Sequence, residues 1–197
     1  IQFNEIVNAI QNNTQLSRIQ ALKNEYKVKS DQELLMALKP HPISLTLAQA
    51  AMESSWGTSR FFNEAKNVFG VWSFNKKEPR IAAAAQRGNK KIWLKKYATI
   101  KDSVRDYYKT LGRSFAFKEF RKERLLSNDP LILVTKLDKY SEKGAAYGQE
   151  LSSMITFNKF LKYDNNNLEY QEKKIVEKIK VSKNEVFEEE ILGIFLK

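Results

Sequence analysis

The sequence predicts a mainly α-helical protein of the α+β class, in which a small two-stranded β-lobe accompanies a helical domain. Apolar residues recur at helical spacing through most of the 197 residues, and capping residues precede several of these runs. Seven glycines and four prolines are too few for a turn-rich β-sandwich, whereas a 42% apolar share is enough for a sizeable core. Two short stretches with the character of strands supply the β-lobe.

The N-terminal residues are predicted to form a layer of helices. Up to about residue 26, apolar residues at helical spacing indicate two helices or one broken helix. Ser30 followed by Glu33 is a capping-box pair, which opens a third helix over residues 31–39. Pro40 and Pro42 end this helix, because proline cannot continue it.

The stretch over residues 45–57, LTLAQAAMESSWG, is the most informative part of the chain. Its small and apolar residues fall on one face of a helix, which Ser44 or Thr46 can cap. Gly57 suits a left-handed turn just past the helix end. Gln49 and Glu53 lie one turn apart and share another face.

Glu53 is the candidate catalytic residue of this helix. We expect it about one turn before the helix C-terminus, where the macrodipole disfavours negative charge, and near the aromatic Trp56. Such a setting raises the pKa of a carboxyl group, as a general acid requires at neutral pH. The alternative is a solvated surface glutamate, the ordinary state of this residue on an amphipathic helix.

The β-lobe is predicted to follow. Residues 60–63 form a polar and aromatic turn, residues 71–74 the first strand and residues 92–97 the second. Residues 75–91 are rich in lysine and arginine and are predicted to be a long basic loop between the strands. A solvated loop without a functional role is the alternative.

Helices are predicted for the rest of the domain. Thr99 with Asp102 caps one helix, which ends at Gly112. A second helix surrounds residues 117–126, and a third occupies residues 131–137. A polar turn over residues 140–147 precedes the last helix.

The composition excludes several kinds of site. The chain has no cysteine, so it has neither a disulfide nor a cysteine metal site. Its one histidine, His41 between two prolines, excludes a multi-histidine metal site and is expected to be a loop residue rather than a catalyst. No run of about 18 apolar residues spans a membrane. The chain begins with Ile1 rather than Met, so we expect a segment upstream of it.

The formal charge of +11 indicates a polyanionic partner or environment, or else only solubility. Nucleic acid, anionic lipid and an anionic cell-wall polymer all fit this charge. The sequence contains no zinc-finger, RNA-recognition or helix-turn-helix pattern, and its positive charges are spread along the chain. We therefore do not expect it to bind nucleic acid.

Three motifs in a fixed order resemble a known family. Ala-x-x-Glu-Ser-x-Trp-Gly occupies residues 50–57, Asn-x-Phe-Gly occupies residues 67–70, and Tyr140 and Tyr147 bound a later turn. Over roughly residues 40–160 this series resembles the glucosaminidase domains of glycoside hydrolase family 73, which include flagellar peptidoglycan hydrolases. The residues within these motifs are similar to those of a periplasmic branch of the family in Gram-negative bacteria.

The resemblance implies a lysozyme-like helical fold with a groove between the helices and the β-lobe. It implies that Glu53 is the general acid and that Tyr140 is the active-site tyrosine, whose hydroxyl can bind substrate or stabilise positive charge. Independently of the resemblance, Trp72 and Trp93 could stack on sugar rings, with a place in the lobe core as their alternative. The candidate substrate-binding residues are Gln49, Ser54, Trp56, Asn67, Phe69, Gly70, Trp72 and Tyr147.

A second carboxylate is the point at which the sequence departs from the family, because many members carry a second glutamate on the β-lobe. Glu78 is the only acidic residue between Asn67 and Thr99, and it is the candidate base or stabiliser. If Glu78 does not serve, the acetamido group of the substrate could assist, or the domain could be weakened or inactive.

We therefore expect a peptidoglycan hydrolase that cleaves β-1,4 glycosidic bonds after N-acetylglucosamine and needs no metal or cofactor. The alternatives are lytic transglycosylase-type cleavage and a catalytically weakened module that binds polysaccharide or protein. The expected partners are peptidoglycan glycan strands, with no integral membrane segment, and the expected location is the periplasm or cell envelope. The glucosaminidase domain is assigned to residues 1–163, with N-terminal helices over 1–40 and core motifs over 44–160. A charged tail over 164–197 could dock on the domain or bind a protein partner.

Overall fold

The computed structural model describes residues 3–87 and 90–164, which are mainly helical and contain a two-stranded antiparallel sheet. The predicted fold class is therefore confirmed. The chain divides into two compact units. Of the described residues, the first unit comprises 3–40 and Asp164, and the second comprises His41–Tyr163. The predicted tail lies outside the described residues, apart from Asp164.

The first unit contains three helices, α1 (Phe3–Gln11), α2 (Leu16–Tyr26) and α3 (Asp31–Leu38). Their apolar faces form a small core of their own, which includes Ile6, Ile19, Leu22 and Leu34. The predicted capping box is confirmed, because the Glu33 amide donates to Ser30 Oγ over 3.1 Å and the Ser30 amide donates to Glu33 Oε2 over 3.2 Å.

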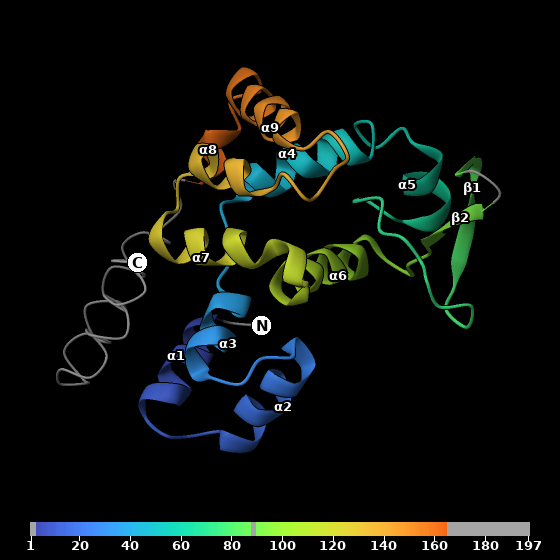
Figure 1. Cartoon of the computed structure of the whole chain (residues 1–197). Helices are drawn as coiled ribbons and strands as arrows, with labels where there is room; N and C mark the ends of the chain where they lie inside the picture. The colour runs from blue at the N-terminus through green and yellow to red at the C-terminus, as the bar shows by residue number, and fades with distance from the viewer. Residues whose placement is uncertain (1–2, 88–89, 165–197) are drawn as a thin grey trace. The chain divides into compact units, whose positions relative to one another are not determined.

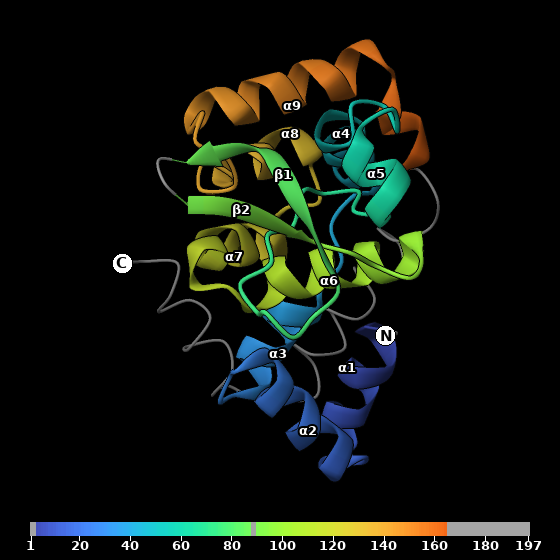
Figure 2. The ribbon, with the colours of Figure 1, turned by 90° about the vertical axis from the view of Figure 1, so that its right-hand side faces the viewer.

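The second unit holds the remaining elements (Figures 1 and 2). They are α4 (Ile43–Glu53), α5 (Arg60–Ala65), β1 (Arg80–Arg87), β2 (Lys90–Lys95), α6 (Ile100–Arg113), η1 (Phe115–Phe117), α7 (Lys118–Leu126), α8 (Pro130–Leu133), η2 (Val134–Lys136), α9 (Ala145–Phe157) and η3 (Phe160–Tyr163). The sheet and α5 lie at one end of the unit, and α7 and α8 lie at the other.

Helix α4 packs side by side with α9, and together they carry much of the core of this unit (Figure 2). Leu45 and Ala48 of α4 are fully buried, as are Leu151 and Ile155 of α9. Burial of such side chains supplies most of the free energy that holds the two helices together, at about 1.5–3 kcal/mol for each large aliphatic group.

The bounds of α4 differ from the prediction. The helix begins at Ile43 after Pro42, and neither Ser44 nor Thr46 caps it. It ends at Glu53, because the backbone takes left-handed conformations from Ser55 to Gly57. Glu53 therefore lies in the last turn, closer to the unfavourable end of the macrodipole than its sequence position suggested.

The first strand was predicted in the wrong place. Strand β1 lies within residues 75–91, which were predicted to be a loop. It pairs antiparallel with β2 from Arg80↔Lys95 to Arg87↔Lys90, with a shift of register between Ala82 and Gln86. Trp72 makes only an isolated bridge to Leu94. The alanine run after Ile81 has low intrinsic strand preference, and the strand is held by the paired residues on either side of it, up to Ala82 and from Gln86 on.

Two smaller predictions also need correction. Residues 60–63 are not a turn but the start of α5, which Ser59 caps by accepting a hydrogen bond from the Phe62 amide. The helix predicted over residues 131–137 is one turn, α8, followed by the 3₁₀ turn η2. The other predicted helices are present within one or two residues of their expected bounds, which is the ordinary uncertainty of helix ends.

Candidate active site

Glu53 and Tyr147 form the centre of the candidate site. Glu53 is the last residue of α4, and Tyr147 stands in the first turn of α9. The packing of these two helices brings the Tyr147 hydroxyl to 2.8 Å from Glu53 Oε1, to which it donates a hydrogen bond. The two residues are 94 positions apart in the sequence, so only the tertiary fold places them together.

Burial raises the pKa of Glu53 above its ordinary value. Two smaller effects act in the opposite direction, namely the hydrogen bond from Tyr147 and the positive charge of Lys143. Removing a carboxylate from water disfavours its charged form, and here this effect exceeds the stabilisation that the two partners provide. Glu53 therefore keeps its proton to a higher pH than a solvated glutamate does.

Tyr140 lies beside this pair. Its ring stacks on the ring of Tyr147 with centroids 5.4 Å apart and an interplanar angle of 9°. Its hydroxyl donates a long hydrogen bond of 3.4 Å to the Phe69 carbonyl. Burial is the main cause that raises the pKa of Tyr140, and the charge of Glu53 adds to it. Tyr140 is therefore a neutral donor at the edge of the candidate site.

The Asn-x-Phe-Gly motif, residues 67–70, forms the wall of the candidate site that faces Glu53. The Asn67 side chain is buried and holds the turn, because its Nδ2 donates to the Val71 and Lys95 carbonyls and its Oδ1 accepts from the Val71 amide. Phe69 stacks on Tyr107 at a centroid distance of 3.9 Å. These contacts make Asn67 and Phe69 supports of the wall rather than exposed binding groups.

Gly70 is the member of the motif that faces the carboxyl group. Its φ of +64° lies in the left-handed region, which favours glycine. A β-carbon added here would lie 3.8 Å from Glu53 Oε2. The absence of a side chain at Gly70 therefore leaves room beside Oε2.

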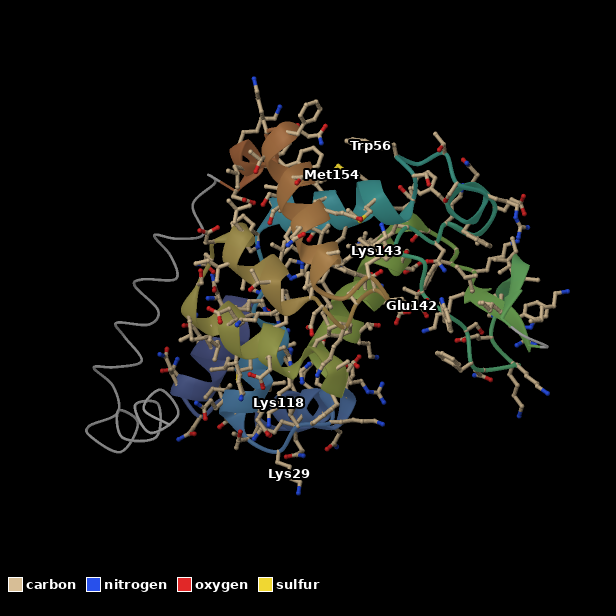
Figure 3. The ribbon with its side chains drawn as sticks, turned by 45° about the horizontal axis from the view of Figure 1, so that its top comes forward. Lys29, Trp56, Lys118, Glu142, Lys143 and Met154 are labelled. Atoms are coloured by element: carbon tan, nitrogen blue, oxygen red, sulfur yellow. The ribbon has the colours of Figure 1, made fainter. Side chains whose placement is uncertain are left out.

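The other candidates on α4 and after it have different surroundings. Gln49 is 0% exposed, donates to the Tyr147 hydroxyl over 3.0 Å, and reaches Glu53 only through that residue. The Ser54 hydroxyl donates to the Ala50 carbonyl and accepts from the Gly57 amide, which closes the end of α4. Trp56 is 59% exposed, and its ring lies 6.2 Å from that of Phe160 (Figure 3).

The two tryptophans of the β-lobe, Trp72 and Trp93, differ in how their rings are covered. Trp72 is 41% exposed and lies 6.1 Å from the ring of Phe74, which is itself 85% exposed. Trp93 is partly covered by the Arg80 guanidinium, which lies 4.2 Å from its ring centroid. Trp72 and Phe74 thus present partly exposed aromatic rings, and the Arg80 guanidinium covers one face of Trp93.

Glu78 lies in a separate environment. It accepts a hydrogen bond of 2.7 Å from Ser73 and lines a cavity of about 350 Å³ with Lys95, Tyr97 and Asp106, among others. Glu53 does not line this cavity. Tyr97 donates to Asp106 over 2.6 Å, and Lys95 forms an ion pair with the same carboxylate.

The sequence alone did not identify Lys143, Tyr107 and His41 as residues of the site. Lys143 lies on the loop before α9, next to Glu142 (Figure 3), and forms an ion pair with Glu150 of 2.7 Å. Tyr107 and His41 are buried behind Gln49. The sequence predicted only that Tyr107 lies in the helix over residues 99–112, and nothing in the sequence around His41 indicates where its ring lies.

No group of three or more histidine, aspartate or glutamate side chains suited to holding a metal ion occurs in residues 3–87 and 90–164. In the same part of the chain, every helix is too short or too polar to cross a membrane. Around Glu53 the structure brings together a carboxyl group whose pKa is raised by burial, the hydroxyls of Tyr140 and Tyr147, and the Lys143 ammonium group.

Comparison with known proteins agrees with the motif order. Residues 32–185 match the family model described as Glucosaminidase, Mannosyl-glycoprotein endo-beta-N-acetylglucosaminidase. Protein bax of Escherichia coli (strain K12) is 28% identical over 159 residues, which cover 74% of this chain and 56% of that protein. The chain thus spans little more than half the length of this relative.

Two solved structures have a similar fold. One is the catalytic domain of the autolysin Auto from Listeria monocytogenes, with a TM-score of 0.52 and 21% identity over 82% of this chain and 87% of that one. The other is a peptidoglycan hydrolase from Sphingomonas sp. A1, with a TM-score of 0.50 and 18% identity over 79% of this chain and 91% of that one.

Proposed function

The chain belongs to this glucosaminidase family of glycoside hydrolases, and we propose that it cleaves β-1,4 bonds after N-acetylglucosamine in peptidoglycan with Glu53 as the general acid. The family match and the peptidoglycan-degrading structural relatives support the substrate class. The proposed partners are glycan strands, and the proposed place of action is the periplasm or cell envelope, where these strands lie.

The position of Glu53 carries this proposal. A general acid must be protonated at working pH and must present its proton to the leaving oxygen. Burial raises the pKa of Glu53, and the space beside Gly70 gives access to Oε2. Tyr140 stands close enough for its hydroxyl to bind the sugar or to stabilise charge on it, and the exposed Trp72 can stack on a neighbouring ring.

The surroundings of Glu53 favour a second candidate, lytic transglycosylase-type cleavage. The groups that shift the pKa of Glu53 are Tyr147 and Lys143, and neither is a carboxylate. Glu78 lines a cavity that Glu53 does not line. A single carboxyl group can act first as acid and then as base without water, or the acetamido group of the substrate can assist hydrolysis.

Product analysis tests both candidates. Purified sacculi are digested with the protein, and the released fragments are identified by mass spectrometry. We expect fragments with a reducing N-acetylglucosamine end. Fragments with an anhydro-sugar end would instead assign transglycosylase chemistry, and binding to sacculi without release of fragments would contradict enzymatic function.

Lys143→Gln is expected to move the alkaline limb of the pH–rate profile to higher pH. The Lys143 ammonium group lowers the pKa of Glu53, so its removal lets Glu53 stay protonated at a higher pH. The shift is small, because the Lys143 side chain is 56% exposed and solvent screens its charge. The measurement is the initial rate of sacculus digestion against pH at low ionic strength.

Lys139→Gln is the matched control, because Lys139 is an exposed lysine in the same loop and is not among the groups that shift the pKa of Glu53. It should leave the alkaline limb in place. A limb that moves equally in both variants would show that net charge, rather than the position of Lys143, is responsible. Added salt should reduce the difference between wild type and Lys143→Gln.

A further inference from the structure

A continuous series of hydrogen bonds between buried side chains runs through the core of the second unit and ends at Glu53. Its members come from α7, the segment before α4, α6, α4 and α9, and each is at most 3% exposed. We call it the buried chain, and its members in order are Arg124, His41, Tyr107, Gln49 and Tyr147. The catalytic proposal for Glu53 uses only the last of them.

The contacts are continuous. Arg124 Nη1 lies 3.4 Å from His41 Nδ1, and His41 Nε2 lies 3.1 Å from the Tyr107 hydroxyl. The Tyr107 hydroxyl donates to Gln49 Oε1 over 2.5 Å. Gln49 Nε2 donates to the Tyr147 hydroxyl over 3.0 Å, and that hydroxyl donates to Glu53 Oε1 over 2.8 Å.

The two ends of the buried chain determine the direction of every bond. A guanidinium group only donates, so His41 Nδ1 is an acceptor and the imidazole proton lies on Nε2. Burial and the Arg124 charge lower the pKa of His41 well below its ordinary value, so the ring is neutral. The proton on Nε2 is then shared between the Tyr107 oxygen at 3.1 Å and the Thr46 hydroxyl at 3.0 Å. From Tyr107 onward each member donates a hydrogen bond to the next, as far as Glu53.

This direction has a consequence for the Glu53 carboxyl group. Because Gln49 donates to the Tyr147 oxygen, the Tyr147 hydrogen is directed to Glu53 Oε1. The proton of the acid therefore belongs on the other oxygen, Oε2, which faces the space beside Gly70. A carboxyl group that can rotate freely would spend part of its time with the proton on the wrong oxygen.

We propose that Tyr107 and Gln49 are positioning residues, which act through Tyr147 to direct the transferable proton of Glu53 to Oε2. This inference rests on the proposed role of Glu53 as general acid. Neither residue touches the open side of the site, because both are buried. Buried polar groups of this kind cost free energy unless every member is bonded, so an apolar core would be the simpler way to stabilise the fold.

The other groups near Glu53 do not replace the buried chain. Lys143 approaches from the loop before α9 and acts through its charge, and its ammonium group is bonded to Glu150. Tyr140 stacks on Tyr147 but donates to the Phe69 carbonyl. Tyr147 is thus the side chain whose hydrogen bond determines the geometry at Oε1.

Tyr107→Phe is the first test. It removes the donor to Gln49 Oε1 and retains the ring that stacks on Phe69. Gln49 becomes a weaker donor, or its amide turns over, and either change weakens the bond from Tyr147 to the ionised Glu53. We expect the pKa of Glu53 to rise further and kcat to fall about tenfold or more with little change in KM, by analogy with outer-shell partners of metal ligands.

The Glu53 pKa is measured without substrate, by following the side-chain carboxyl carbon of Glu53 by NMR against pH. This measurement tests the positioning role of Tyr107 and Gln49 separately from the proposed enzymatic function. A rise in pKa in Tyr107→Phe supports the positioning role even if wild type releases no product, and an unchanged pKa overturns it even if wild type is active. Gln49→Met, which has a similar volume and no donor, should shift the titration in the same direction and decides the matter if Tyr107→Phe does not fold.

Tyr108→Phe is the matched control. Tyr108 is the next residue on α6, and its hydroxyl bonds to Thr46 over 2.8 Å. Thr46 Oγ1 also lies 3.0 Å from His41 Nε2, so Tyr108 joins the buried chain only upstream of Tyr107, and its loss leaves the bond from Tyr107 to Gln49 in place. Tyr108→Phe should lose stability as Tyr107→Phe does, because each variant loses a hydroxyl that is hydrogen-bonded within the fold. The Glu53 titration and kcat should stay as in wild type. Equal shifts in the two variants would assign the effect to general loosening of the core and would overturn the proposal.

Discussion

Glu53→Gln is expected to lower the rate of glycosidic bond cleavage by about 10²- to 10⁴-fold, the usual contribution of general acid catalysis. The amide keeps nearly the same shape and can still accept the Tyr147 hydrogen bond through its oxygen. It has no proton of suitable acidity for the leaving oxygen, so the loss should appear in kcat with KM little changed. The measurement is the rate of fragment release from purified sacculi.

Glu64→Gln provides the control for this substitution. Glu64 is an exposed residue of α5 whose carboxylate pairs with Arg60 over 3.3 Å. The same chemical change there should leave the rate within the error of the assay, because an exposed ion pair contributes little. A Glu53→Gln variant that digests sacculi at the wild-type rate would contradict the assignment of Glu53 as the general acid.

Glu53→Gln is also expected to raise the thermal stability of the protein at neutral pH. Burial raises the pKa of Glu53 in the folded protein above its ordinary value of 4.5, so the unfolded chain loses this proton more readily than the folded one. Glu53 therefore costs stability as the pH rises above 4.5 and through the folded pKa, and it costs nothing below 4.5, where both states are protonated. The difference in Tm between Glu53→Gln and wild type should accordingly be positive at pH 7 and shrink as the pH falls toward 4.5.

The parts of the structure that could be predicted from the sequence depend on neighbours in the chain. The capping box of Ser30 and Glu33 and the cap of Thr99 on α6 involve residues three positions apart, and both were predicted. The shared face of Gln49 and Glu53 follows from helical spacing alone. The resemblance of the motifs to a family is confirmed by the family match, because motif order survives where overall identity is low.

The parts that could not be predicted depend on residues far apart in the chain. Gln49 meets Tyr107 across 58 positions and Tyr147 across 98, and no local pattern indicates that its face of α4 turns inward. The same holds for β1, whose pairing with β2 on both sides of the alanine run joins residues that no local pattern marks as a strand. The position of Tyr107 on its helix would be the same whether its ring only packs in the core or its hydroxyl also belongs to the buried chain, so the sequence does not distinguish the two.

Gly148→Ala is expected to destabilise the protein by about 1–3 kcal/mol, although alanine is the better helix former by about 1 kcal/mol. Gly148 is a buried residue of α9, and a β-carbon there would lie 2.7 Å from the Val134 carbonyl oxygen of η2. The obstacle is backbone rather than a flexible side chain, so α9 and η2 must move apart. The measurement is the free energy of unfolding by chemical denaturation.

Activity should fall together with stability in Gly148→Ala, which links this packing contact to the candidate site. Gly148 follows Tyr147 directly, so a shift of α9 away from η2 changes the distance from the Tyr147 hydroxyl to Glu53 Oε1, now 2.8 Å. Ser153→Ala, on an exposed position of the same helix, also improves helix propensity and meets no such obstacle. It should change stability by less than about 0.5 kcal/mol and leave the rate unaltered. If Gly148→Ala proves as stable and as active as Ser153→Ala, close approach of α9 to η2 is not what positions Tyr147.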